Sequence, residues 1–513
     1  SLPMRRIGID VGGTNTDGAL LDGERVIETI KTPTTTDVLG GIRNVLDGLS
    51  HRDIDAVVIG TTQFTNAVVQ RSNLNRVGFL RIGLPAGRSL PPLSGWPSDL
   101  AEAVRSDTFL VRGGIEYDGR PFEELDEQGV IDAAHQFADS GINAVVVAGS
   151  FSPIDTRQEL RAAELIAEHH PKSQVTVSHR LGQLGLLERE NAAGLNACLL
   201  ELAESVIAAF GAAIDQAGLG SQTRLFLTQN NGTLLQIDEA VKYPVLTFAS
   251  GPTNSMRGAA ALGGVDDGLV VDVGGTTADF GALVSGYPRQ ANAAVEVGGV
   301  RTLFQLPDVL SIGLGGGSRI HTDPLRLGPD SVGQRLVTEA LAFGGAVPTL
   351  TDAAIATGLL QVDGTSPPDL ANAEEVLEYA AKMIADGADR MKLSSLEVPL
   401  IAVGGGAFAV SDVMAGITEV IRPIQGDTAN AIGAALAEVS GVIDRVFHDM
   451  GHDAAVSEAI RLATEDAVAS GADPTMVEVI EVEDLPLAYL PGDARRIRVR
   501  VVGPLESLHS SNG

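Results

Sequence analysis

Short runs of β-branched residues alternate with longer helical patterns in the N-terminal part of the chain. Five of these runs predict strands, because they are rich in Val and Ile and are bounded by polar or glycine-containing turns. They lie at residues 5–10, 55–60, 76–83, 143–149 and 174–178. Apolar residues with helical spacing occupy residues 37–49, 130–141 and 155–170. This alternation indicates an α/β protein in which most strands pair in parallel.

The pattern begins again after a long helical stretch at residues 185–218, which predicts a bridge into a second half. Further strands are expected within residues 224–232, 268–286 and 398–410. Small residues at 428–441 predict a helix that packs closely where the halves cross.

The last part of the chain predicts a small appended element. A helical pattern covers residues 454–470, and Pro491-Gly492-Asp493 separates two alternating runs, which is typical of a hairpin. We therefore divide the chain into residues 1–190, 191–441 and 442–513, two halves and an extension.

One acidic, glycine-rich turn occurs twice. "DVGGTNTD" at residues 10–17 and "DVGGTTAD" at residues 272–279 each lie between two predicted strands. Each is expected to be a β-hairpin whose two glycines let backbone N–H groups approach phosphate oxygens closely. A single Gly-Gly turn is weak evidence for phosphate binding. Two copies in the same setting predict that two halves of the chain bind one phosphate chain from opposite sides.

The hairpins supply candidate ligands for a nucleotide with its metal. Asp10 and Asp272 end the incoming strands, where a carboxylate can hold the water shell of Mg²⁺ between phosphates. Asp17 and Asp279 follow the turns and either orient them, face the cleft as catalytic groups, or simply cap their own turn. The tip residues expected to contact phosphate are Gly12, Gly13, Thr14, Asn15, Gly274, Gly275, Thr276 and Thr277.

A third glycine cluster, "AVGGGAF" at residues 402–408, follows a predicted strand and precedes a predicted helix. Gly404, Gly405 and Gly406 would let a nucleoside lie against the backbone while the helix N-terminus faces a phosphate. The alternative is a tight strand-to-helix turn. No Gly-Lys dipeptide occurs in the chain, which excludes a lysine-bearing P-loop.

Charge and cysteine content narrow the partners and the location. Lys and Arg total 36 against 66 Asp and Glu, a net charge of −30 that disfavours nucleic acid and anionic membranes. No apolar stretch reaches about 18 residues, the length of a membrane span. Cys198 is the single cysteine and is expected to pack as a small hydrophobic residue. These features predict a cytoplasmic protein.

Other polar residues are weaker candidates. Asp308 and Asp352 could contact metal or substrate, or could serve the fold alone. His448 and His452 stand four residues apart, a spacing that could hold a metal on one helical face, but Gly451 interrupts that helix.

Two phosphate hairpins, a late glycine turn and a small-residue helix, in this order, resemble the actin, Hsp70 and sugar-kinase superfamily. Within it the chain resembles the hydantoinase/oxoprolinase family, in the type of its ATP-binding A subunit. The motifs that carry this resemblance are "GIDVGGTNTDGALL", "IGTTQFTNAVVQR", "TQNNGTL", "FASGPTNS", "SIGLGGGS" and "VPTLTDAAIATG", and they extend from about residue 5 to 441.

The resemblance implies a duplicated actin-like fold, two ribonuclease-H-like halves around a nucleotide, with ATP and Mg²⁺ as cofactors. It implies an ATP-dependent hydrolase that opens a cyclic amide such as a hydantoin, 5-oxoproline or a lactam, while related members serve ATP-dependent carboxylases of ketones. Residues implied to line the cleft around the substrate are Thr61, Thr62, Asn66, Asn231, Ser250 and Gly251. Ile59 and Leu310 stand where the family commonly has His. The chain therefore departs from the family at a residue type that can bind a metal, and its substrate preference is open.

Two other functions remain open at this point. A small-molecule kinase of the same fold would stop after phosphoryl transfer, and a nucleotide switch in the style of actin would turn over no cyclic amide. The family also implies a partner, a second hydantoinase-type subunit or the second half of a fused chain. The alanine-rich helices would also let the chain pair with another copy of itself.

Overall fold

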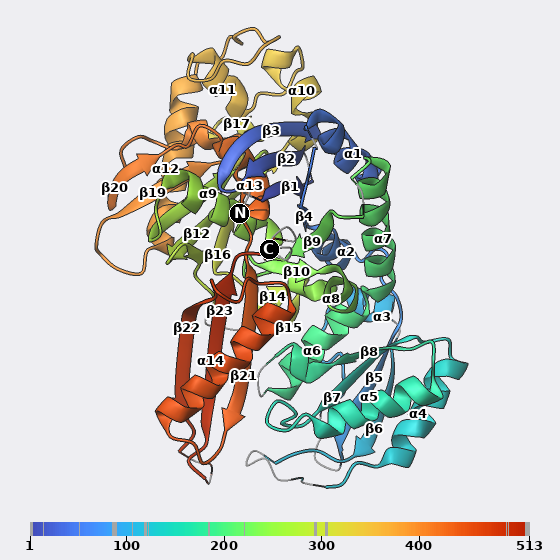
Figure 1. Cartoon of the computed structure of the whole chain (residues 1–513). Coiled ribbons are helices and arrows are strands. Elements are labelled where there is room, and N and C mark those ends of the chain that lie inside the picture. Colours follow the sequence, from blue (N-terminus) through green and yellow to red (C-terminus); the bar gives the residue numbers. More distant parts are fainter. Residues whose placement is uncertain are drawn as a thin grey trace.

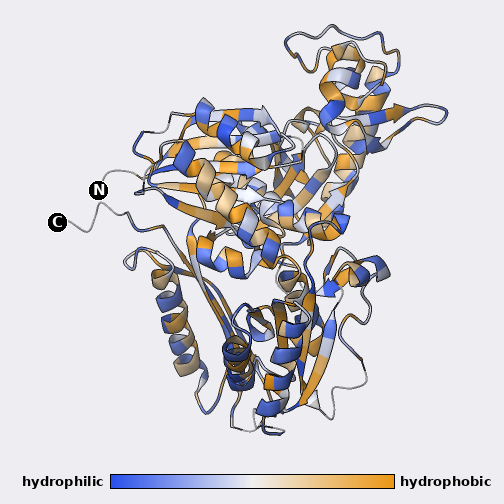
Figure 2. Ribbon diagram, turned by 90° about the vertical axis from the view of Figure 1, so that its right-hand side faces the viewer, coloured by the Kyte–Doolittle hydropathy of each residue, from blue (hydrophilic) through white to orange (hydrophobic). Residues whose placement is uncertain are grey.

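The computed structural model describes the chain except for residues 1–3, 14, 51, 85–89, 105, 117–120, 122, 183–184, 220, 292–294, 303–305, 489, 491 and 508–513. The described residues form three larger sheets, each covered by helices, a three-stranded antiparallel sheet near the C-terminus, and two two-stranded sheets, β14-β15 and β17-β18 (Figure 1). Helices on the outside of the molecule alternate between hydrophobic and hydrophilic residues, as expected when one face is buried (Figure 2).

The first sheet has the strand order β10-β9-β4-β1-β2-β3. Strands β4 and β9 run parallel to β1, whereas β2 and β3 continue as an antiparallel meander. Its strands are β1 (Arg5–Val11), β2 (Asn15–Asp22), β3 (Arg25–Pro33), β4 (Ala56–Thr61), β9 (Arg224–Thr228) and β10 (Leu234–Gln236). Helices α1 (Val38–Gly48) and α7 (Leu200–Gln216) cover one face, where Ile7, Ile9 and Ile59 are fully buried.

The second sheet repeats this arrangement of directions. Its order is β13-β12-β11-β19-β20, with β19 and β20 parallel to β11 and with β16 antiparallel to β12. The strands are β11 (Gly268–Val273), β12 (Ala278–Val284), β13 (Tyr287–Pro288), β16 (Val309–Ile312), β19 (Val398–Val403) and β20 (Ile417–Ile421). Helix α12 (Ala373–Met391) packs on one face and α9 (Ser250–Gly263) on the other.

Two helices made of small residues lie between these sheets. Helix α13 (Ala429–Ala435) packs on β1 and β2 and also contacts α9. A Cβ on Gly433 would lie 1.8 Å from the carbonyl oxygen of Asn254, and one on Gly258 would lie 1.9 Å from that of Ala429. Only glycine allows the helix backbones to approach this closely.

The helix predicted at residues 428–441 is present, but it ends at Ala435, and β21 (Val439–Phe447) follows it.

A third, wholly parallel sheet is inserted between β4 and β9, at the lower right of Figure 1. Its order is β6-β5-β7-β8, with strands β5 (Val77–Leu84), β6 (Asp107–Arg112), β7 (Ala144–Gly149) and β8 (Gln174–Val177). Its helices are α2 (Gln63–Gln70), α3 (Ser98–Val104), α4 (Glu127–Asp139), α5 (Arg157–His169) and α6 (Leu186–Ala197). The strands and helices expected between residues 76 and 178 are found in this unit. The sequence pattern did not separate the unit from the first half, and it missed α2, α3 and β6.

The long helix expected at 185–218 is divided. Helices α6 and α7 bend by 49° at Cys198 and Leu199. The Cys198 thiol is fully buried, and burial raises its pKa to about 12, which agrees with the expected packing role. In the described part of the chain, no single helix is long and apolar enough to cross a membrane, and α6 with α7 reaches that length and composition only as a bent pair.

The C-terminal extension contains the predicted helix and hairpin together with one unpredicted strand. Strands β22 (Glu478–Pro486) and β23 (Arg495–Gly503) form the hairpin, and β21 pairs with β23 from the other side. Helix α14 (His452–Ala469) packs on this sheet through buried alanines at every fourth position. The division proposed at residues 190 and 441 cuts α6 and β21.

The remaining elements are short. They are α8 (Ile237–Lys242), β14 (Val295–Val297), β15 (Val300–Thr302), β17 (Ser318–His321), β18 (Arg326–Ser331), α10 (Leu336–Glu339) and α11 (Leu350–Ala356).

Candidate functional site

The two repeated motifs fold into hairpins with the same register. Asp10 pairs with Asp17 across β1 and β2, and Asp272 pairs with Asp279 across β11 and β12. Each turn is closed by the same bond: the Gly12 N–H donates to the Asn15 carbonyl at 3.0 Å, and the Gly274 N–H donates to the Thr277 carbonyl at 2.9 Å. The equivalence predicted from the sequence therefore extends to individual backbone hydrogen bonds.

Both hairpin tips leave room beside their second glycine. A Cβ placed on Gly13 or Gly275 would meet no heavy atom within 4 Å among the described residues. Open space beside a glycine backbone is the condition that a phosphate-binding turn requires. Thr14 lies outside the described residues.

A turn that the sequence analysis did not assign to the site supports the second hairpin from behind. The N–H groups of Gly316 and Gly317 donate to the carbonyls of Gly274 and Gly275, each at 2.8 Å. A Cβ on Gly315 would lie 2.5 Å from the Gly275 carbonyl carbon, so the backbones touch. The "SIGLGGGS" motif thus fixes the tip of β11–β12 and offers a structural reason for its three glycines.

Asp10 is nearly buried and is held by side chains from distant parts of the chain. The Asn430 amide of α13 donates to Asp10 Oδ2 at 3.0 Å and to Asp17 Oδ2 at 2.8 Å. Burial, followed by repulsion from Asp17, raises the pKa of Asp10 to about 7. Lys31 on β3 forms an ion pair with Asp17 at 3.2 Å, yet burial still raises the pKa of Asp17.

The acids of the second hairpin are arranged similarly with different partners. Ser255 Oγ of α9 donates to Asp272 Oδ2 at 2.6 Å, and burial raises the pKa of Asp272. Ser311 Oγ of β16 donates to Asp279 Oδ1 at 2.7 Å, and burial raises the pKa of Asp279 to about 6. Asp17 and Asp279 therefore have partners on neighbouring elements and do more than cap their own turns.

The donor set fits a hard divalent cation. Asp272 lies close enough to Asp10 for its charge to contribute to the raised pKa of Asp10, so carboxylates from the two sheets face one region. Asn254, also beside Asp10, has a buried Oδ1 that accepts no hydrogen bond from any described residue. Mg²⁺ is commonly bound by one or two carboxylates together with substrate phosphates and water, and its charge would offset this repulsion. Among the described residues, no three or more acidic, His or Cys side chains are arranged so that they could hold a metal ion by themselves.

The glycine turn at 404–406 contacts the second hairpin directly. Gly404 has φ +90°, and a Cβ there would lie 2.4 Å from Asp272 Oδ1. The Gly406 N–H donates to the Val273 carbonyl at 2.7 Å, while the space beside Gly405 is open. The prediction of a helix after this turn is wrong, because only a three-residue 3-10 turn, Ala407–Ala409, follows. A turn this short has no helix N-terminus that could bind a phosphate.

Five of the six residues expected to line the cleft gather beside the first hairpin. Thr61 pairs with Val11, the Ser250 hydroxyl donates to the Thr61 carbonyl at 3.1 Å, and the Asn66 amide donates to Thr62 Oγ1 at 3.3 Å. Gly251 faces the Thr62 methyl group at 3.5 Å, measured from a Cβ built on the glycine. The sixth, Asn231, bonds Thr233 and lines a different cavity, so the structure does not bring it to this group.

Several other candidates have structural roles. Asp352 is fully buried, completes the capping box of α11 and accepts bonds from the Leu341 and Ala342 N–H groups. Asp308 forms an ion pair with Arg289 at 3.0 Å. His448 precedes α14, which begins at His452, so the two histidines do not share a helical face.

The two positions that depart from the family pattern are apolar in their surroundings as well. Ile59 is fully buried in the core beneath the first sheet. Leu310 on β16 packs against the core of the second sheet. Both side chains therefore pack against apolar neighbours.

The sheets and their paired hairpins define an α/β protein with the actin-like ATPase fold. The crystal structure of an ATP-dependent caprolactamase from Pseudomonas jessenii superposes with a TM-score of 0.76 at 19% identity, covering 98% of this chain and 88% of that one. A nucleotide-free acetone carboxylase superposes with a TM-score of 0.66 at 20% identity and the same coverage.

The chain belongs to the hydantoinase/oxoprolinase family. The model of the family's N-terminal region matches residues 6–170, and the hydantoinase/oxoprolinase model matches residues 189–420. This match confirms the resemblance found in the sequence.

Two curated relatives illustrate the range of the family. The caprolactamase subunit alpha of Pseudomonas jessenii is 27% identical over 386 residues, 69% of this chain and 54% of the relative. The acetophenone carboxylase gamma subunit of Aromatoleum aromaticum is 29% identical over 423 residues, 73% of this chain and 56% of the relative. The chain thus spans about half the length of these relatives.

Proposed function

We propose that this chain binds ATP with Mg²⁺ between its two hairpins and uses it to activate the carbonyl oxygen of a cyclic amide, which is then opened by water. The observation that carries the proposal is the pair of hairpins with equal register, each with an aspartate beside an open glycine tip, Asp10 buried and Asp272 partly buried. Family membership supports the same assignment, and the names of the relatives include both a caprolactamase and ketone carboxylases.

The chemistry explains why ATP is needed. An amide carbonyl is a weak electrophile and its nitrogen is a poor leaving group. Attack of the amide oxygen on the γ-phosphorus forms an O–P bond and breaks the bond to ADP. Water then adds to the activated carbon, the ring C–N bond breaks as nitrogen takes a proton, and a second water releases phosphate from the resulting acyl phosphate.

The residues of the chain contribute mainly position and electrostatics. Backbone N–H groups at both tips would contact the phosphates, and the Thr61–Thr62 and Ser250–Gly251 segments would line the substrate position beside the first hairpin. Mg²⁺ would supply neutralising charge at the transferred phosphoryl group when bound. Asp10 and Asp272 are the groups suited to hold it, and Asp17 and Asp279 orient the strands that follow.

The test is an ATP-dependent ring-opening assay with hydantoin, 5-oxoproline and ε-caprolactam. Because relatives are named as subunits, we propose that a second polypeptide, either another subunit or another copy, completes the enzyme. The chain should therefore be assayed alone and with proteins encoded beside it. Ring-opened acid with equimolar ADP and phosphate supports the proposal, and fast opening by the lone chain contradicts the need for a partner.

The products separate the alternatives. A phosphorylated substrate that accumulates without ring opening identifies a kinase, and ATP turnover insensitive to every cyclic amide identifies a nucleotide switch. Bicarbonate-dependent consumption of a ketone identifies a carboxylase, the activity in the names of two relatives.

Matched variants connect the activity to the hairpins. Asp10→Ala and Asp272→Ala should each lower kcat about 10²–10³-fold, the usual cost of losing one well-placed stabilising group. Asp132→Asn removes an exposed carboxylate from α4 and should leave kcat unchanged. Rates within a few-fold of the parent in both Ala variants would contradict the assigned roles.

A further inference from the structure

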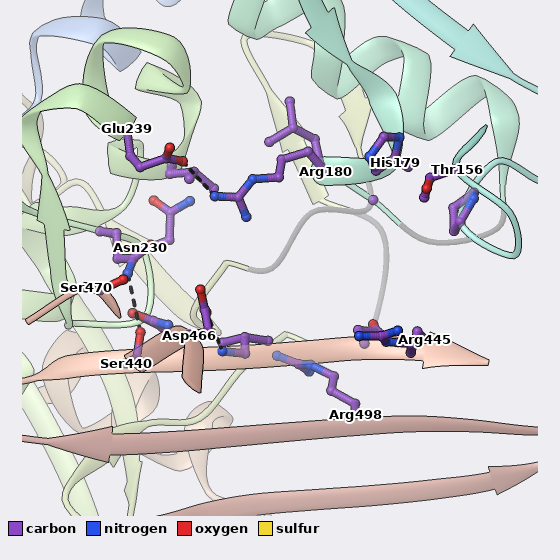
Figure 3. Close-up of a pocket in the computed structure, with 18 of the residues that line it drawn as sticks. Thr156, His179, Arg180, Asn230, Glu239, Ser440, Arg445, Asp466, Ser470 and Arg498 are labelled. Atoms are coloured by element: carbon purple, nitrogen blue, oxygen red, sulfur yellow. Dashed lines mark hydrogen bonds and ion pairs between the residues drawn. The ribbon is translucent and has the colours of Figure 1, made fainter. Parts of the chain in front are cut away.

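A second cavity lies away from the hairpins, between the inserted sheet and the C-terminal sheet. Its volume is about 840 Å³, and its lining comes from the loop after β7, the turn after β8, the segment from Gln229 to Glu239, and strands β21 and β23 with the end of α14. Figure 3 shows these elements surrounding one space. None of the hairpin or glycine-turn residues described above is among them.

The cavity lies at the carboxyl ends of strands in a parallel sheet, one strand away from a topological switch point. In the order β6-β5-β7-β8 the chain leaves β5 first to one side and then to the other, so the switch point lies between β5 and β7. Open parallel sheets bind ligands at the carboxyl ends of their strands near such a point. The lining segments 153–157 and 179–182 directly follow the carboxyl ends of β7 and β8.

A buried network fixes this edge of the sheet. Glu159 is fully buried and accepts bonds from the Gly149 N–H at 2.8 Å, the Ser178 hydroxyl at 2.6 Å and the His179 ring at 2.9 Å. Arg189, also fully buried, donates to the Gly149 carbonyl at 2.9 Å and forms an ion pair with Glu159 at 3.3 Å. The ends of β7 and β8 are thus held in a defined position, which keeps His179 and Arg180 at the cavity wall.

The charges of the lining differ from those of the rest of the surface. Five arginines and four carboxylates line the cavity, a balance of +1 in a chain whose net charge is −30. The arginines are Arg157, Arg180, Arg445, Arg496 and Arg498. Four of these arginines already pair with carboxylates, Arg498 with Glu481 just outside the lining. The positive charge that is not yet paired among the described lining residues is that of Arg445, and it would attract a small anion.

Two of these arginines face the space from separate parts of the chain. Arg180 reaches across the upper wall to Glu239, with which it forms an ion pair at 2.7 Å, and Arg445 lies on the opposite strand β21 (Figure 3). Arg445 is exposed and forms no ion pair with any described residue. Asn230 and Ser440 close one end of the space, Ser440 from β21 itself (Figure 3).

We infer that this cavity is a second ligand site, which binds a small organic anion through a carboxylate or phosphate group held by Arg180 and Arg445. Planar guanidinium groups suit both oxyanions. The occupant would link the inserted sheet to the C-terminal sheet, because its contacts come from both. The inference is independent of the reaction proposed for the hairpins.

Isothermal titration calorimetry with glutarate and with inorganic phosphate tests the site. A non-hydrolysable ATP analogue with Mg²⁺ is kept in the cell so that the hairpins are occupied. At least one probe should bind the full chain, and Arg180→Gln and Arg445→Gln should each weaken it about tenfold. Binding of glutarate alone identifies a carboxylate site, and binding of phosphate alone identifies a phosphate site.

Arg461→Gln is the matched control. It removes the same charge from an exposed position on α14 outside the cavity, so it should bind as the parent does. The inference is wrong if neither probe binds, or if the cavity variants bind like Arg461→Gln. A failure of nucleotide binding would leave the comparison of these variants intact and would count only against the proposed function.

Discussion

At the scale of single residues, Asp10 is suited to hold Mg²⁺, but its buried carboxylate lowers the free energy of unfolding when it is charged. Its pKa of about 7 in the folded chain lies above the value near 3.8 of a free carboxyl. Between about pH 4 and 7 the folded chain therefore retains a proton that the unfolded chain has lost, and the free energy of unfolding falls as pH rises.

Asp10→Asn should remove this dependence. With EDTA present and no nucleotide, the free energy of unfolding should be higher for the variant than for the parent at pH 8. The difference between the two free energies should shrink towards pH 4 by up to about 1.4 kcal/mol per pH unit. Urea unfolding at each pH measures it. A constant difference between parent and variant across this range would show that Asp10 ionises normally.

Asn430 gives a second prediction at this scale. Its amide donates to both Asp10 and Asp17, and these bonds favour the charged carboxylates. Asn430→Ala should therefore move the acidic limb of the pH profile of kcat for ATP hydrolysis to higher pH. Asn44→Ala, on an exposed position of α1, is the control and should leave the profile in place. An unchanged profile in Asn430→Ala would remove Asn430 from the site.

At the scale of elements, the crossing of α9 and α13 is the contact on which both sheets depend. A Cβ on Gly433 would lie 1.8 Å from a carbonyl oxygen of α9, closer than any side-chain shift can relieve. Gly433→Ala should lower the free energy of unfolding by about 3 kcal/mol or more, at the upper end of overpacking effects.

The control for this element is Gly211→Ala. Gly211 lies inside α7, and a Cβ there meets no described atom within 4 Å, so alanine should stabilise the helix by about 0.5–1 kcal/mol. Denaturant unfolding of both variants gives the comparison. Equal stability of the two variants would mean that the helices can separate without cost.

The elements also show what the sequence could and could not predict. The hairpins were predictable because their turn, strands and acids are contiguous and occur twice. The sequence analysis missed three hydrogen-bond partners of the hairpin aspartates, Asn254, Ser255 and Asn430. They reach the hairpins only because α9 and α13 cross there, although Asn254 and Ser255 belong to the quoted "FASGPTNS" motif. Strand β21 was missed because its start continues an alanine-rich helical pattern, and only pairing with β23 selects the extended form.

At the scale of the whole molecule, one nucleotide should act on both sheets together. The charge of Asp272 contributes to the raised pKa of Asp10, although the residues lie 262 positions apart in the sequence. An ATP analogue with Mg²⁺ should therefore slow amide hydrogen exchange in residues 8–18 and 270–280 at the same time. Asp272→Asn should weaken the protection of both segments, and protection confined to one hairpin would contradict a shared site.

The inserted sheet and the late position of α13 have a consequence for synthesis on the ribosome. Ala19 and Leu21 of the first sheet are fully buried against Ala431, Ile432 and Ala435, which are made about 400 residues later. At about 5–20 residues per second, this interval lasts tens of seconds. The inserted parallel sheet, contiguous between β5 and β8, can close during that time. Strands β1 and β2 therefore leave the ribosome long before the helix that covers this face of the sheet, and Ala19 and Leu21 stay exposed to aggregation until α13 has been made.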